Sequence, residues 1–225
     1  PERSTMKKLI LSFLPIFILS SQVFAIAGFG LNLNKSMYSV AESTSSLKFE
    51  NIEVATITQH EFENGLGIGG YLYIDAIPMV DLDIEGSLII SPYEFSFTNL
   101  LTSIDKQQFG WVDASGYITL QKKILKLSIP FLAKAKLTAG AGVNSHSSTP
   151  MVDQKMMETV MGGAGNLESG TLDTDELIKY LKDNKVSSTG FHIQAGLQFK
   201  LLMLDSFLFY RQVIADDVIP GAKGF

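Results

Sequence analysis

Apolar and polar residues alternate with a period of two along several long segments of the chain. One face of the segment around residues 80–90 carries apolar or small residues, namely Val80, Leu82, Ile84, Gly86, Leu88 and Ile90. The other face carries Asp81, Asp83, Glu85 and Ser87. Successive side chains point to opposite faces of a β-strand, whereas a helix would scatter these charges around its surface. The alternation recurs at 29–34, 133–144 and 191–201, so the sequence predicts strands with one apolar and one polar face.

The alternation and the turn residues together predict strands at about 28–35, 65–76, 79–98, 113–129, 132–145, 188–202 and 206–214. Their connections alternate between short ones, near 76–78, 129–131 and 203–205, and long ones, at roughly 36–64, 99–112 and 146–187. Short periplasmic turns that alternate with longer extracellular loops are typical of an outer-membrane barrel. The predicted fold class is therefore all-β, an antiparallel up-and-down transmembrane β-barrel with about seven strands in this sequence and eight expected.

The parity of the strands predicts one more strand than the sequence shows. Barrels of this type have an even number of strands, so we expect an eighth strand after Phe225. A terminal phenylalanine is itself familiar at the end of an outer-membrane strand, but no alternating strand precedes it in 220–225. We therefore expect residues 28–225 to be an outer-membrane β-barrel domain that is truncated at its C-terminus.

The strand lengths and connections of this chain resemble those of the small eight-stranded bacterial outer-membrane β-barrels, such as the transmembrane domain of outer-membrane protein A. The resemblance covers nearly the whole chain after residue 27, but it depends on layout because no specific motif carries it. It implies a porin-like or structural protein in the outer membrane of a Gram-negative bacterium, inserted by the barrel-assembly machinery. No functional residue is carried over from it.

The N-terminal residues are typical of a secretory signal peptide. Met6, Lys7 and Lys8 precede an apolar run at 9–19, and small residues that allow cleavage follow. We expect residues 6–27 to be removed, with cleavage before Ile26 as the alternative, and residues 1–5 to be upstream and non-native. An uncleaved anchor is disfavoured because the run is shorter than the roughly 20 residues of a spanning helix and contains Pro15.

Composition narrows the function further. The chain has no cysteine, which removes disulfides, thiolate metal sites and cysteine nucleophiles. Without the leader, 15 basic and 22 acidic residues remain, a balance of −7, so nucleic-acid binding is not expected. His60, His146 and His192 lie far apart and show no metal-ligand spacing. We expect no metal and no cofactor.

If the apolar faces contact lipid, the polar faces line the interior of the barrel. The charged residues that would fall there, near the periplasmic ends of the strands, are Asp75, Asp81, Asp83, Glu85, Lys126, Lys134, Lys136 and Lys200. About eight strands enclose a space that side chains just fill, so we expect these charges to pair and to close the interior. A change of phase near Gln121–Lys123 indicates a bulge. A solvated face of a soluble sheet is the alternative.

The third long loop changes from a strand pattern to a helical one. Thr149 and Pro150 predict the start of one helix, and Asp173 with Glu176 predicts the start of a second. Apolar positions of these helices include Met151, Met156, Leu177 and Leu181. We expect a helical hairpin that forms the loop's own small core and covers the barrel mouth. Contact with a ligand or a partner is the alternative.

The sequence thus predicts a non-enzymatic outer-membrane barrel with a structural or surface role, or a narrow passage for small or apolar solutes. Its expected partners are outer-membrane lipid and the assembly machinery. One rival is a soluble periplasmic or secreted β-barrel that binds a small ligand, in which Asp81 and Lys134 would be exposed and Phe199 buried. Another is a lipid-modifying enzyme that would use His146, Ser147, Ser148 and Asp153 at the start of the third loop.

Overall fold

A computed structural model describes residues 27–49, 52–77, 80–100, 103–129, 133–160, 174–201, 204–219 and 222–223. Its strands are β1 (Ala27–Val40), β2 (Ser43–Phe49), β3 (Ile52–Gln59), β4 (Phe62–Ile77), β5 (Val80–Asn99), β6 (Ser103–Ile129), β7 (Ala133–Ser148), β8 (Val186–Leu201), β9 (Leu204–Ala215) and β10 (Ala222–Lys223). Its helices are α2 (Gln154–Val160) and α3 (Thr174–Asp183). The all-β class is therefore confirmed. The predicted leader lies outside the described residues, except for Ala27.

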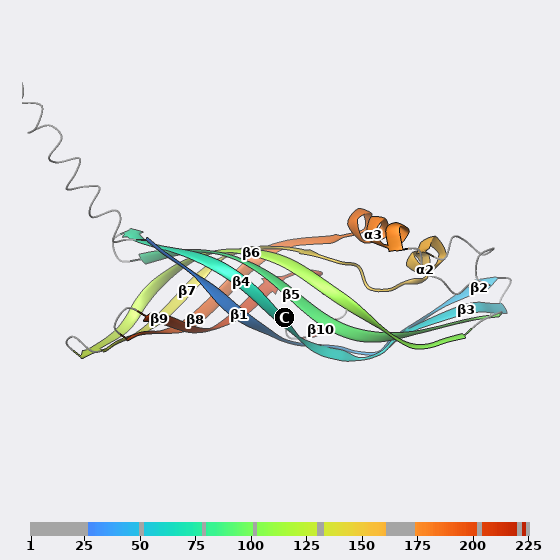
Figure 1. Ribbon diagram of the computed structural model, residues 1–225, viewed down its shortest axis with the longest axis horizontal. Coiled ribbons are helices and arrows are strands. Elements are labelled where there is room, and N and C mark those ends of the chain that lie inside the picture. The colour runs from blue at the N-terminus through green and yellow to red at the C-terminus, as the bar shows by residue number, and fades with distance from the viewer. Residues whose placement is uncertain are drawn as a thin grey trace, which may run out of the picture.

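The strands form a single antiparallel sheet in the order β10-β1-β4-β5-β6-β7-β8-β9, and β2 and β3 branch from β5. Figure 1 shows a long, twisted and curled sheet. The strand ends that have short connections lie at its left, and α2, α3, β2 and β3 lie at its right. We refer to these as the turn end and the helix end. Among the described residues the sheet is not closed, because β9 pairs with β8 alone and β1 pairs with β4 and, at Ser39 and Val40, with β10.

The strands continue further toward the helix end than predicted. β5 and β6 pair as far as Thr98↔Ser103, so the predicted connection at 99–112 is mostly strand. The predicted connection at 36–64 contains β2, β3 and the ends of β1 and β4. Both predicted connections were wrong. At 99–112 the reason is that residues 103–110 show no regular alternation, and their extended conformation depends on pairing with β5.

The inner face of β5 changes from polar to apolar near Ser91, and the outer face changes from apolar to polar. Side chains continue to alternate between the two faces along the whole strand. Toward the turn end, Asp81 and Glu85 on the inner face are buried and Leu88 on the outer face is exposed. Toward the helix end, the inner face carries Tyr93, Phe95 and Phe97, all buried. The sheet is therefore apolar outside and polar inside over its turn-end half, and has an ordinary apolar core at its helix end.

The exposed apolar residues of the turn-end half cover the outer face of every long strand. Leu31 on β1 is 89% exposed, and Phe191 on β8 and Leu208 on β9 are each 67% exposed. We call this set the apolar band, and its main members are Phe29, Leu31, Leu33, Leu66, Ile68, Ile84, Leu88, Ile90, Ile118, Leu120, Val143, Phe191, Ile193, Phe199, Leu208 and Ile214. Soluble proteins rarely expose so much contiguous apolar surface.

The two helices pack on the inner face at the helix end. Met156 is buried in the same cluster as Trp111 and Tyr93, and Met151, Leu177 and Leu181 pack against that cluster. Neither described helix is long and apolar enough to span a membrane. Burial and the neighbouring Asp153 carboxylate raise the pKa of Tyr180 to about 12, so its hydroxyl remains protonated and donates to Asp153.

The predicted start of the first helix was wrong. Asp153 Oδ1 accepts from the backbone N–H of Met156 at 2.7 Å, so Asp153 is the N-cap and α2 begins at Gln154. Thr149 instead continues the contact with β6, because its Oγ1 accepts from the Val112 N–H and its own N–H donates to the Val112 carbonyl.

Candidate functional site: the polar interior

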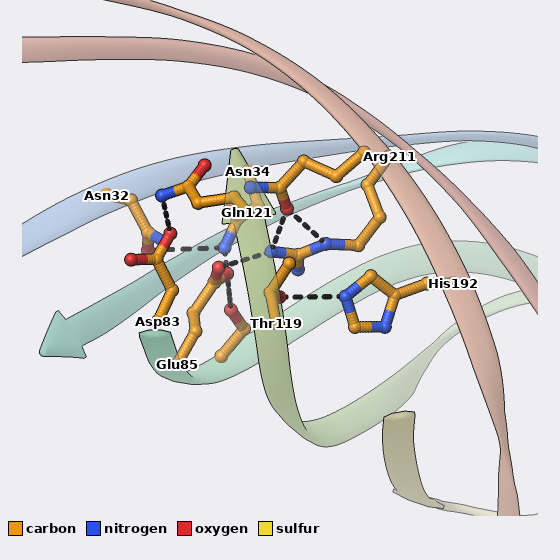
Figure 2. A network of polar contacts seen from close by, with 10 residues as sticks. Asn32, Asn34, Asp83, Glu85, Thr119, Gln121, His192 and Arg211 are labelled. Carbon is orange, nitrogen blue, oxygen red and sulfur yellow. Dashed lines mark hydrogen bonds and ion pairs between the residues drawn. The ribbon is translucent and has the colours of Figure 1, made fainter. Parts of the chain in front are cut away.

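The inner face of the turn-end half brings polar side chains from β1, β5, β6, β8 and β9 together. Arg211 on β9 is the centre of this group. Its Nη2 donates to Glu85 Oε2 at 2.6 Å, and Nε and Nη2 donate to Gln194 Oε1 at 3.0 and 2.8 Å. The guanidinium also lies over the ring of Tyr117, 3.8 Å from its centroid. Figure 2 shows that Arg211 points across the interior toward Glu85.

Further hydrogen bonds extend this group to β1. Asn34 Nδ2 donates to Ser87 Oγ at 2.9 Å, and Ser87 Oγ donates to Glu85 Oε1 at 3.0 Å. Glu85 thus bonds directly to Arg211 on β9 and, through Ser87 of its own strand, connects to Asn34 on β1. We call the set Asn34, Glu85, Ser87, Tyr117, Gln194 and Arg211 the interior network.

Two other polar contacts flank the interior network. Gln121 on β6 donates to Asp83 on β5, and Thr119 Oγ1 is 2.8 Å from Nε2 of the buried His192 (Figure 2). The three successive inward positions of β6, namely Tyr117, Thr119 and Gln121, therefore each contact a polar partner in the interior. A low-dielectric interior makes an unpaired charge costly, so such pairing is needed for these residues to be buried.

A separate ion pair cluster lies at the turn end. Lys123 Nζ is 2.9 Å from Asp75 Oδ2 and 3.1 Å from Asp81 Oδ1. The β6–β7 register shifts between Lys123 and Leu125, close to the bulge predicted near Gln121–Lys123. Lys123 precedes the shift and keeps the parity of Gln121, so it lies on the same face as Asp81, although the sequence pattern did not select it.

The structure places the predicted interior charges in different settings. Glu85 belongs to the interior network, Asp83 contacts Gln121, and Asp75 and Asp81 contact Lys123. Lys126 is exposed and lies opposite Lys136 in the sheet. The side chains of Lys134 and Lys200 lie outside the described part of the structure. Arg211 was missed, although it is the single arginine after residue 3 and alternates inward with Phe207 and Phe209.

A second buried pair lies between the interior network and the helices. His146 Nδ1 on β7 is 2.9 Å from Asp113 Oδ2 on β6, and the two side chains are 1% and 0% exposed. The ring of Tyr117 contacts those of His146 and His192 edge to face. Ser148, one of the serines in the enzyme hypothesis, donates to the carbonyl of Val218. The pair is thus enclosed and faces no described cavity.

The cavity of the interior lies between the free edges of β1 and β9 and has a volume of about 540 Å³. Residues 31–37 and 206–213 form its two sides, and Tyr71, Tyr73, Glu85, Tyr117 and Gln194 contribute to its floor. In the described part of the chain, no group of three His, Asp or Glu side chains is arranged to hold a metal ion. The cavity is lined by hydrogen-bonding and aromatic groups and by aliphatic side chains such as Leu31, Leu33 and Leu208.

Comparison of the chain with family models, with curated proteins and with solved structures finds no match. The apolar band, the interior network and the two free edges are the features of this chain that indicate a function.

Proposed function

We propose that this chain forms the wall of a small outer-membrane β-barrel of a Gram-negative bacterium, exported by its signal peptide, with a closed interior and a non-enzymatic structural or surface role. The observation that carries the proposal is the apolar band. The band surrounds the same half of the sheet whose inner face is charged, which is the arrangement of transmembrane barrels.

The height of the apolar band fits a membrane. On β8 it extends from Phe191 to Phe199, and on β5 from Ile84 to Ile90, with the half-buried Leu82 on the same face below it. A tilted strand needs about 9 to 11 residues to cross the hydrocarbon core. Beyond Ser91 the outer face becomes polar, with Glu94 and Ser96, while the inner face becomes aromatic. This change supports a membrane boundary near Ser91.

The interior network supports a barrel that does not conduct ions. Arg211 reaches from β9 to Glu85 on β5, and its guanidinium is stacked on Tyr117. These side chains cross a space that a barrel of about eight strands can only just enclose. A narrow passage for small or apolar solutes would require the Arg211–Glu85 pair to separate.

The helix end supports a role at the cell surface. β2, β3, α2 and α3 lie beyond the apolar band, and β3, α2 and α3 share a buried core that includes Ile57, Phe97 and Met156. We propose that α2 and α3 form a helical hairpin that covers the barrel mouth. This part would project from the membrane as an ordered, water-soluble structure.

The two rival functions receive less support. A soluble ligand-binding barrel would need Asp81 exposed and Phe199 buried, whereas Asp81 is buried and Phe199 is 49% exposed. An enzyme could use the Asp113–His146 pair as an oriented acid–base group, because a carboxylate fixes the imidazole. Both side chains are enclosed, so a substrate would have no route to them.

Heat modifiability tests the proposal. The protein is produced from its full reading frame in a Gram-negative host, and the outer-membrane fraction is compared on gels with and without boiling. A membrane barrel is expected in that fraction, with faster migration before boiling. Recovery as a soluble periplasmic protein with no shift would reject the proposal.

A further inference from the structure

We propose that two copies of this chain associate within the membrane through the outer faces of β6, β7, β8 and β9, with Lys122 of each copy in contact with Tyr210 of the other. This inference rests on the membrane function proposed above and goes beyond it, because that function requires no partner protein. The observation that carries it is a lysine on the lipid-facing surface.

Lys122 lies on the outer face of β6, in the middle of the apolar segment of that strand, and its side chain is exposed. On its helix-end side Ile118 and Leu120 are 50% and 53% exposed, and on its turn-end side Leu125 and Leu127 are 54% and 64% exposed. From Ile118 to Leu127 the strand covers roughly the 9 to 11 positions with which a tilted strand crosses the hydrocarbon core. Lys122 is therefore far from both membrane surfaces.

A lysine in this position needs a partner from another molecule. A charge on the lipid face of a barrel is strongly destabilising near the middle of the bilayer. Lys122 makes no hydrogen bond or ion pair with any residue that the structure describes. The neighbouring Lys123, by contrast, points to the inner face and contacts Asp75 and Asp81. Charged residues in a membrane are usually paired, so the exposed ammonium group indicates an interface.

The residues that are paired in register with Lys122 form a row across the outer face. The pairings Lys122↔Ala139, Ala139↔Ala195 and Ala195↔Tyr210 connect β6, β7, β8 and β9 directly. Tyr210 is 55% exposed. The row therefore carries a cation at one end, a phenol at the other end and two methyl groups between them.

This order makes the row complementary to itself. A two-fold axis along the membrane normal, placed between β7 and β8, brings Lys122 of one copy to Tyr210 of the second copy, and the reverse. Such an interface uses the same patch on both copies, as closed dimers do. The alanines at its centre let the two sheets approach closely, so that the longer side chains at its ends can reach each other.

Tyr210 supplies a group that a lysine can bind inside the apolar band. It lies on the outer face of β9 between the exposed Leu208 and Ile214. Its hydroxyl donates to Gln212 Oε1 at 3.2 Å, which leaves the lone pairs of the phenol oxygen available to an ammonium donor. The ring face attracts a cation as well. Both contacts are stronger in a low-dielectric surrounding than in water.

Disulfide formation between copies tests the interface, because the chain has no cysteine of its own. Ala195→Cys places one thiol beside the proposed two-fold axis, and the full-length protein is oxidised in outer membranes and separated on a non-reducing gel. We expect a covalent dimer. The matched control, Leu88→Cys on the outer face of β5, is exposed on a different side of the sheet and should remain monomeric.

The contribution of the lysine is measured in the same assay. Lys122→Met combined with Ala195→Cys should lose most of the covalent dimer while the amount of heat-modifiable protein stays the same or rises. Tyr210→Phe combined with Ala195→Cys should also lower the yield of dimer. Equal dimer yield with and without Lys122 would overturn the proposed contact.

The remaining outcomes separate this inference from the function on which it rests. A heat-modifiable protein that stays monomeric after oxidation of Ala195→Cys would overturn the interface and leave the membrane function intact. Lys122 would then be satisfied by a lipid phosphate. Failure of the parent protein to reach the outer membrane would instead reject the membrane function, and the inference with it.

Discussion

Arg211 and Glu85 form an ion pair with 2.6 Å between Nη2 and Oε2, although they are 126 residues apart in sequence. Three strands, β6, β7 and β8, separate β9 from β5 in the sheet. The pair can form only because the sheet curls so far that inner-face side chains of β9 reach those of β5. This contact therefore reports on the curvature of the whole wall.

Removal of one partner of this pair should destabilise the protein strongly. Arg211→Met leaves the buried Glu85 carboxylate without its cation, and loss of one member of a buried pair costs about 3–5 kcal/mol. Glu85→Gln combined with Arg211→Met should recover part of that loss, because neither charge is then left alone. Urea unfolding of the refolded protein in detergent micelles measures both. Equal stability of the single and double variants would contradict the coupling.

The interior network should also block ion flow. The parent protein is expected to show no resolved single-channel conductance in a planar bilayer, because the Arg211–Glu85 pair, stacked on Tyr117, crosses the interior. Arg211→Ala with Glu85→Ala should produce conductance events. Gln108→Ala, at an exposed position beyond the apolar band, is the control and should remain silent. Conductance of the parent would show that the interior is open.

A charge placed on the apolar band should impair insertion. Leu88→Lys puts an ammonium at the lipid-facing middle of β5, where such a substitution costs roughly 2–4 kcal/mol. Thr98→Lys on the same face, beyond the proposed boundary, should be tolerated. The fraction of heat-modifiable protein in the outer membrane distinguishes them. If the two variants behaved alike, the band would not be a lipid contact.

Two glycines, Gly30 on β1 and Gly86 on β5, should respond in opposite ways to the same substitution. At Gly30 an added Cβ would lie 2.5 Å from the Tyr71 hydroxyl oxygen, so Gly30→Val should destabilise by about 1–3 kcal/mol. At Gly86 an added Cβ meets nothing within 4 Å, and strands favour β-branched residues, so Gly86→Val should be neutral or stabilising. Urea midpoints of the two variants provide the comparison.

Packing of α3 should weaken at high pH. The pKa of Tyr180 rises from its ordinary value of 10.0 to about 12 in the folded state, so the folded protein holds this proton more tightly than the unfolded chain. Stability contributed by Tyr180 is present below pH 10 and is lost between about pH 10 and pH 12. Tyr180→Phe should reduce that loss, as followed by limited proteolysis of 174–183. Burial raises the pKa of Tyr93 as well, so some loss should remain.

Local pattern was enough to predict the orientation of the turn-end half. Alternation at 80–90 and 191–201 placed Asp81 and Glu85 inside and Leu88 and Phe191 outside, because side-chain direction in a strand follows position parity alone. The same reasoning predicted the apolar residues of α2 and α3 that pack on the core. The local pattern gave the wrong prediction at 103–112 and at Thr149, where pairing with β5 and β6 determines the backbone conformation.

The sequence by itself determined the all-β class, the two faces of the long strands and the short connections, since each depends on residues close together in the chain. Only the tertiary structure decided that Arg211 meets Glu85, that Lys123 joins Asp75 and Asp81, and that β10 pairs with β1. Those contacts depend on the curl and register of a sheet whose partners lie far apart in sequence. No local periodicity encodes that curvature, because it results from the twist of all the paired strands together.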